Sequence, residues 1–147
     1  MKKLKLLLPL FLLFCLTSYA QKDKHEQIKA LKVSYFTTEL NLSTDEAAKF
    51  WPIYNAFDEK QYKIRHDKMR PLIKKIDEVG FDKMSEKEAS GYLDKLEAAD
   101  KELLELKMKL ADDLKSVIGS AKILKLKKAE EDFKKKLIEQ FKDKKKD

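Results

Sequence analysis

The residues that could perform chemistry are few and lie far apart in the sequence. The chain holds two histidines, His25 and His66, and each stands beside one acid, Glu26 and Asp67. Adjacent side chains point about 100° apart on a helix, so we expect neither pair to offer two ligands to one metal. A zinc site needs three or four ligands in suitable geometry. The sequence therefore predicts no metal site.

Acidic residues cluster at 112–113 and at 130–132, where paired carboxylates could suggest acid–base catalysis. Both clusters have lysines nearby, as Asp132 has Lys136 four residues on, and this pattern is typical of a solvated helix face. The sequence contains no glycine-rich phosphate loop, nucleophile elbow or His-Glu-x-x-His motif. We therefore expect a protein that is not an enzyme and that uses no cofactor.

A cluster of four aromatic residues is the most distinctive group in the sequence. Phe50, Tyr54 and Phe57 can share one helical face, whereas Trp51 leans away from it. Aromatic residues at helical spacing usually pack in the core. The same residues could also bind flexible segments through apolar burial, with low selectivity. All four are candidate contacts for a partner or client, and Trp51 is the first among them.

The first twenty residues have the layout of a secretory signal peptide. A basic segment with three lysines precedes an apolar run over 6–16, and small residues follow, as cleavage between Ala20 and Gln21 requires. We therefore expect residues 1–20 to be removed on export to the periplasm. The apolar run is short for a permanent membrane span, and no transmembrane segment is expected in the mature chain.

Removal of the signal peptide changes the composition. It takes 20 of the 147 residues, with three of the 33 basic residues and no acid, so the formal charge falls from +7 to +4. The single cysteine, Cys15, is also lost; as a lipid-attachment site it would follow Phe14, where a small residue is usual. The mature chain then has no disulfide or catalytic cysteine. Export and the near balance of charge argue against a nucleic-acid partner.

Apolar residues recur at spacings of three and four along the mature chain, which predicts an all-α fold. Four helices are expected, near 24–40, 44–76, 85–119 and 120–141, with a loop over 77–84. Pro52 and Pro71 should kink the second helix, and Gly119 should end the third. The helices would form an elongated hairpin or a bundle in one domain over 21–141, followed by a frayed lysine-rich tail over 142–147.

Two helix starts carry capping boxes. Ser43 with Glu46, and Ser85 with Glu88, have the spacing at which the serine accepts from a backbone N–H and the glutamate reaches back. After Ser85, apolar residues recur every seven positions, at Ala89, Leu96, Leu103, Leu110 and Val117. Such a seam is typical of a coiled coil. It could pack on the other helices of the same chain or on a second copy, and we expect a homodimer because the single-chain core would be shallow.

Leu42, Ser43 and Glu46, followed by the run Phe-Trp-Pro-Ile-Tyr, resemble the Spy/CpxP-related envelope stress proteins. The first signature of that family is leucine, threonine, two variable residues and glutamine, so serine and glutamate replace two of its members here. The aromatic extension resembles a branch described as sensors of extracytoplasmic-function sigma factors. The second signature should fall near 118–122, where only Ser120 fits.

This resemblance implies a fold and two functions. Spy-like proteins are helical hairpins that pair antiparallel and bind unfolded clients without ATP, while CpxP-like relatives restrain a sensor kinase in the membrane. The resemblance thus implies a periplasmic envelope-stress protein whose partners are unfolded clients. The alternative is an accessory sensor that acts through a membrane-bound stress regulator. The family role of Leu42, Ser43 and Glu46 is to cap and pack a helix junction, and no client-binding residue carries over.

Light scattering tests the expected homodimer. Residues 21–147 at high micromolar concentration should have the mass of two chains, because the heptad seam would offer a second copy a continuous apolar stripe. The mass of a single chain at that concentration would contradict the expectation.

Overall fold

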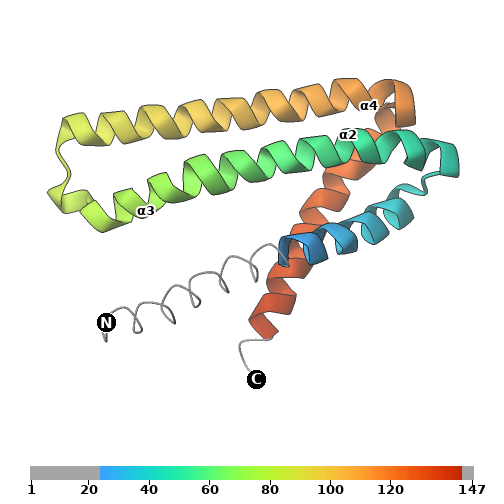
Figure 1. The fold of residues 1–147 in the computed structure, drawn as a ribbon, viewed down its shortest axis with the longest axis horizontal. Coiled ribbons are helices and arrows are strands. Elements are labelled where there is room, and N and C mark those ends of the chain that lie inside the picture. The colour runs from blue at the N-terminus through green and yellow to red at the C-terminus, as the bar shows by residue number, and fades with distance from the viewer. Residues whose placement is uncertain (1–23, 144–147) are drawn as a thin grey trace, which may run out of the picture. The chain divides into compact units, whose positions relative to one another are not determined.

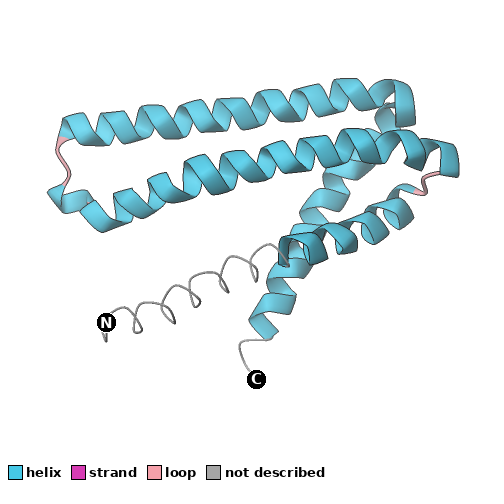
Figure 2. Ribbon diagram, in the orientation of Figure 1, coloured by secondary structure: helices cyan, strands magenta, loops and turns pink. Residues whose placement is uncertain are grey.

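A computed structural model describes residues 24–143. The signal peptide predicted over 1–20 and the last four residues of the predicted tail lie outside the described residues. The described elements are helices joined by short turns (Figure 2), so the predicted all-α fold is confirmed. No helix in this part of the chain combines the length and the apolarity that crossing a membrane requires.

The chain divides into two compact units. Among the described residues, one unit holds 24–41 together with 125–143, and the other is Leu42–Leu124. The second unit is a helical hairpin, and Figure 1 shows its two arms side by side. The elements of the hairpin are α2 (Thr44–Lys63), a π-helix (Ile64–Met69), α3 (Arg70–Val79), a 3-10 helix (Phe81–Lys83) and the first part of α4 (Glu86–Asp143). The loop between the arms is therefore shorter than the predicted one, because α3 continues to Val79.

The two prolines of the first arm have different settings. Pro52 lies inside α2, which continues through it as an α-helix. Pro71 follows the π-helix, in which each N–H reaches five residues back, as the N–H of Arg70 does to the carbonyl of Arg65. Pro71 itself lies in the first turn of α3, where a helix tolerates a residue without an N–H. The irregularity expected at Pro71 is thus a π turn.

Both predicted capping boxes are present. Glu46 Oε2 accepts from the N–H of Ser43 at 2.9 Å, and Ser43 Oγ accepts from the N–H of Glu46 at 3.2 Å. Glu88 Oε2 accepts from the N–H of Ser85 at 3.0 Å, and Ser85 Oγ accepts from the N–H of Glu88 at 3.3 Å. Each box satisfies N–H groups that the first helical turn leaves without partners, so it fixes where α2 and α4 begin.

A cluster of buried side chains joins the two arms of the hairpin. Ile64, the first residue of the π-helix, packs with Ala99 and Leu103 of α4, and Met69 and Leu106 lie at the edge of this cluster. Burial of one large aliphatic side chain contributes about 1.5–3 kcal/mol. The cluster therefore fixes the register between the arms at the π-helix.

The buried stripe of α4 follows the predicted seam and then departs from it. Leu103 and Leu110 are buried, but Val117 of the predicted column is only half-buried, and Leu114 and Ile118 continue the buried stripe. A strict seven-residue column drifts about 20° per heptad on an α-helix, so the buried face moves to the next residue. Since Leu103 and Leu110 are buried within a single chain, the seam does not require a second copy.

In the first unit, a helix over 24–40 packs on the end of α4. Phe36 and Leu40 are buried on the helix, and Phe133 is buried on α4. The ring centroids of Phe36 and Phe133 are 5.8 Å apart in an edge-on arrangement, and those of Tyr35 and Phe133 are 5.6 Å apart. Aromatic contacts thus hold this unit together.

The prediction of one ion pair in the first unit is wrong. The sequence paired Asp132 with Lys136, but the carboxylate of Asp132 accepts from Lys128, one turn earlier. The ammonium of Lys136 instead lies 4.4 Å from the centroid of the Tyr35 ring, in the geometry of a cation–π interaction. The ring provides this lysine with an alternative partner that helical spacing alone does not reveal.

The count of four helices also differs from the structure. α4 is one element where the sequence predicted a third and a fourth helix. Within it, Gly119 has a non-helical backbone, with φ 74° and ψ 163°, and α4 is kinked there. This region of backbone space is essentially restricted to glycine. Two helices therefore meet across the kink at Gly119, which is the boundary that the sequence predicted.

Alanine at two glycines of α4 should have opposite effects on stability. A Cβ at Gly119 or Gly91 would meet no atom within 4 Å, so backbone conformation decides the outcome. Gly119→Ala should lower the free energy of unfolding by about 1–3 kcal/mol. Gly91→Ala lies in regular helix and should raise it by about 0.5–1 kcal/mol. Urea unfolding followed by circular dichroism measures both, and a stabilising Gly119→Ala would contradict the account of the kink.

Candidate functional site

Glu46 ties the start of α2 to α4. Its Oε2 accepts from the N–H of Ser43 and also from Lys122 Nζ at 2.6 Å. Lys122 lies just beyond Gly119 and 76 residues from Glu46 in sequence. The side chain of Glu46 is 25% exposed and that of Lys122 is 30% exposed. Water therefore screens this ion pair less than a fully exposed one. The helix junction expected at Leu42, Ser43 and Glu46 therefore includes a lysine from the segment where the second signature was expected.

The junction lowers the pKa of a carboxyl group. The hydrogen bond from Lys122, followed by that from the backbone of Ser43, holds the pKa of Glu46 below its ordinary value of 4.5. Hydrogen bonds from Ser85 lower the pKa of Glu88 in the other capping box. Both carboxylates are thus ionised at neutral pH, and each places a negative charge at the positive end of a helix dipole.

The aromatic cluster divides into core and surface. Phe50, Tyr54 and Phe57 are buried, with 0%, 2% and 5% of their surfaces exposed. The rings of Phe50 and Tyr54 stack with centroids 5.4 Å apart. Trp51 is half-buried, and its ring meets that of Phe50 edge-on at 4.9 Å. The sequence left open whether these aromatic residues are core or contacts. Phe50, Tyr54 and Phe57 belong to the core, and Trp51 is the accessible candidate.

His66 and Asp67 contact each other, contrary to the expectation that adjacent side chains diverge. The His66 Nδ1 lies 3.0 Å from Asp67 Oδ1, and the imidazole stacks on the ring of Tyr62 with centroids 5.0 Å apart. Both residues belong to the π-helix, where the angle between neighbours differs from the α-helical 100° on which the expectation rested. The pair supplies two of the three or four ligands that zinc requires.

A groove runs between the two arms of the hairpin, and we call it the inter-arm groove. Near the loop it is a hollow of about 500 Å³ lined by Lys68, Pro71, Leu72, Lys75, Tyr92, Lys95, Ala98, Ala99 and Glu102. It continues as a hollow of about 420 Å³ lined by Lys60, Lys63, Ile64, Asp67, Lys68, Glu102, Glu105, Leu106 and Lys109. Since Lys68 and Glu102 line both hollows, the two are halves of one groove.

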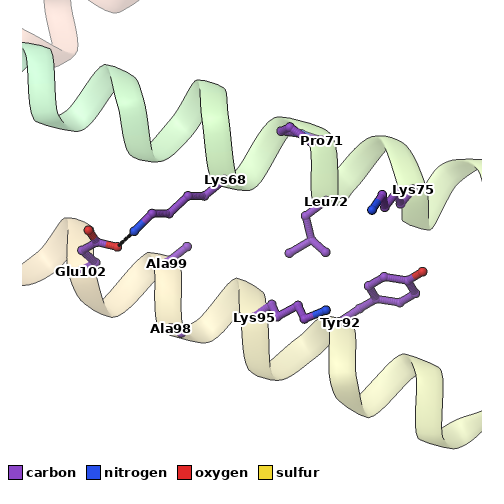
Figure 3. Close-up of a pocket in the computed structure, with 9 residues that line it drawn as sticks. All are labelled: Lys68, Pro71, Leu72, Lys75, Tyr92, Lys95, Ala98, Ala99 and Glu102. Carbon is purple, nitrogen blue, oxygen red and sulfur yellow. Dashed lines mark hydrogen bonds and ion pairs between the residues drawn. The ribbon is translucent and has the colours of Figure 1, made fainter.

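An ion pair crosses the middle of the inter-arm groove. Lys68 Nζ on the π-helix lies 2.5 Å from Glu102 Oε2 on α4 (Figure 3). In the same view Leu72 extends from α3 into the space between the arms. Lys68 and Glu102 are 34 residues apart in sequence, and they meet only because of the register between the arms. No local pattern in the sequence could have identified this groove.

Large apolar side chains are exposed on the hairpin. Leu93, Leu104 and Met108 of α4 are 55%, 58% and 60% exposed, and Phe81 beside the loop is 78% exposed. Leu93 and Leu104 are eleven residues apart, close to three full helical turns, and so share one face. Single exposed apolar side chains are ordinary, but a set on one helix face is a feature of interaction surfaces.

No family model, curated protein or solved structure matches the chain. The described residues define a class by geometry: an all-α protein with an ion pair at a helix junction, an inter-arm groove and exposed apolar side chains on a hairpin.

Removal of the Lys122 ammonium should raise the pKa of Glu46. In Lys122→Gln, a carboxyl-detected NMR titration should find the Glu46 pKa closer to 4.5. The pKa of Glu88 should be unchanged, because hydrogen bonds from Ser85 lower it and Lys122 does not. A folded-state pKa below the unfolded value gives stability above pH 4.5 that is lost as pH falls through the folded pKa. Acid should therefore lower the Tm of the wild type more than that of Lys122→Gln.

The matched control for this experiment is Lys107→Gln, which removes an exposed lysine from the same helix. It should leave the Glu46 pKa and the acid-induced change in Tm as in the wild type. An unchanged Glu46 pKa in Lys122→Gln would show that the ion pair is not formed in solution.

Proposed function

We propose that this protein is exported to the periplasm and binds unfolded or extended polypeptide segments there without ATP, as an envelope-stress protein of the Spy type. The observation that carries the proposal is the exposure of Leu93, Leu104, Met108 and Phe81 on a lysine-rich hairpin. A protein that holds unfolded chains needs apolar surface that its own fold leaves in water. This hairpin has such surface on α4 and beside its loop.

The chemistry of these side chains suits clients of varied sequence. Methionine and leucine adapt to differently shaped apolar partners, and flexible apolar surfaces favour promiscuity over specificity. Exposed lysines around them, such as Lys107 on α4, would attract acidic stretches over a Debye length of about 8 Å at physiological salt. Binding would then be of modest affinity and low selectivity, as transient protection of unfolded chains requires.

Two further observations support the same proposal. The first is the sequence layout of 1–20, since the signal peptide expected there would direct the chain to a compartment without ATP. The resemblance at Leu42, Ser43 and Glu46 implies a Spy/CpxP-like hairpin, and the capping box and ion pair at these residues are compatible with the role of a helix junction. The half-buried Trp51 would be a secondary contact near that junction.

An aggregation assay tests the proposed function. Residues 21–147 should suppress the light scattering of an unrelated, chemically denatured protein at near-stoichiometric amounts. The double variant Leu104→Ser and Met108→Ser should need roughly tenfold more protein for the same effect, since it removes two exposed apolar contacts of about 1 kcal/mol or less each. Both positions are exposed, so the fold should be retained.

The matched control is the double variant Glu97→Ser and Asp100→Ser, which changes two exposed polar residues of the same helix. It should suppress aggregation as the wild type does. Failure of the wild-type protein to suppress aggregation would refute the proposed function, and equal losses in the two double variants would refute the role of the apolar side chains.

A further inference from the structure

We infer that the inter-arm groove binds an extended polypeptide segment in which acidic and apolar side chains alternate. The inference rests on the proposed function in that it names the class of segment held. The groove would be a second binding surface, because Leu93, Leu104 and Met108 do not line it. Three features of the groove carry it: the state of its charges, its length and the composition of its floor.

The acidic side chains that line the groove have partners of opposite charge or imidazole character, whereas most of its lysines do not. The two hollows together are lined by six lysines and three acids. Each acid has a cationic or imidazole neighbour: Glu102 has Lys68, Asp67 has His66, and Glu105 has Lys101 at 4.0 Å.

Most of the lysines in the groove have no such neighbour. Lys68 bonds Glu102, and Lys109 bonds Asp113 at 2.8 Å. Within the described part of the chain, no ion pair engages the remaining four, which are Lys60, Lys63, Lys75 and Lys95. Two of the four lie in each hollow, so the unpaired positive charge extends along the groove on both sides of the Lys68–Glu102 bridge. The complement of this pattern is an anionic ligand with charges spread along its length.

The length of the groove favours a chain over a compact ion. Its first-arm residues run from Lys60 to Lys75, and at about 1.5 Å per helical residue this is roughly 20 Å. An extended polypeptide rises about 3.3 Å per residue, so about six residues would fill the groove. Successive side chains of such a segment point to opposite sides.

The floor of the groove is apolar while its rim is basic. Leu72 and Tyr92 line the hollow near the loop, and Ile64 and Leu106 line the other. The small side chain of Ala99 extends toward the first arm and leaves room there (Figure 3), and Ala98 also lines this hollow. An alternating segment would place its apolar side chains on this floor and its carboxylates beside the lysines. A segment with both kinds of side chain would therefore bind better than one with either alone.

Fluorescence anisotropy with labelled peptides of about eight residues tests the inference. A peptide of alternating glutamate and leucine should bind residues 21–147 at least tenfold more tightly than the same peptide with glutamine in place of glutamate. Its affinity should fall as salt is added, because exposed charges are screened. Equal affinity for the two peptides would overturn the inference. Displacement of the peptide by polyphosphate at equal charge concentration would also overturn it, since charge alone would then suffice.

Charge reversal locates the binding site. Lys75→Glu with Lys95→Glu should weaken binding of the glutamate–leucine peptide by roughly tenfold, as expected for two partly solvated ion pairs. The matched control, Lys49→Glu with Lys87→Glu, changes the net charge equally at two exposed lysines outside both hollows. The control should bind within about twofold of the wild type, and equal weakening in both would place the peptide elsewhere.

A steric variant tests the groove without a change of charge. Ala98→Phe adds a bulky side chain to the lining of the hollow near the loop and should weaken peptide binding. Ala56→Phe places the same side chain at an exposed alanine of α2 outside both hollows. Circular dichroism establishes that both variants remain helical. Unaltered binding by a folded Ala98→Phe would overturn the assignment to the groove.

The outcomes separate this inference from the proposed function. Suppression of aggregation without preference for the acidic peptide would leave the proposed function intact and remove the groove as the binding site. Specific binding of the acidic peptide by a protein that does not suppress aggregation would refute the proposed function and keep the groove as a peptide site.

Discussion

The hairpin depends on contact between its two arms along a single face of each. Ile64 packs against Ala99 and Leu103 at the centre of that contact. Two antiparallel helices can bury one stripe each, so most of their surface stays in water, and charged residues make up 40% of the chain. The same geometry leaves room along the line where the arms meet, which becomes the inter-arm groove, and it leaves Leu104 and its neighbours without cover. The features that suggest binding thus follow from the two-helix architecture of the hairpin.

Local features of the sequence predicted local structure well. The capping boxes at Ser43 and Ser85 and the irregular backbone at Gly119 each depend on a few consecutive residues. The all-α fold followed from apolar spacing. Features that depend on register were not predicted: the Lys68–Glu102 pair requires the π-helix and the length of the loop to be known together. The buried stripe beyond Leu110 was misplaced for a related reason, since drift accumulates over a long helix.

The carboxylate of Glu46 has two roles: it caps the start of α2 and it forms an ion pair with Lys122. A glutamine, as in the signature that this segment resembles, would cap α2 equally well, because its amide oxygen also accepts from the Ser43 N–H. Only a carboxylate also forms a charged pair with Lys122. Glu46 and Lys122 therefore complement each other in charge. The link reaches from the first turn of α2 to the turn after the kink at Gly119.

The π-helix at Ile64–Met69 sets the rotational phase of the rest of the first arm. A π-helix rotates less per residue than an α-helix. Over six residues the accumulated difference is roughly the rotation of one α-helical residue, about 100°. In an uninterrupted α-helix Leu72 would turn away from the groove and Ile76 would turn away from its buried position. The π-helix thus rotates α3 relative to α2, so that the apolar faces of both helices point toward the second arm. In such an arm, the number of residues in 64–69 matters as much as their identity, and an insertion or deletion there would rotate a whole surface.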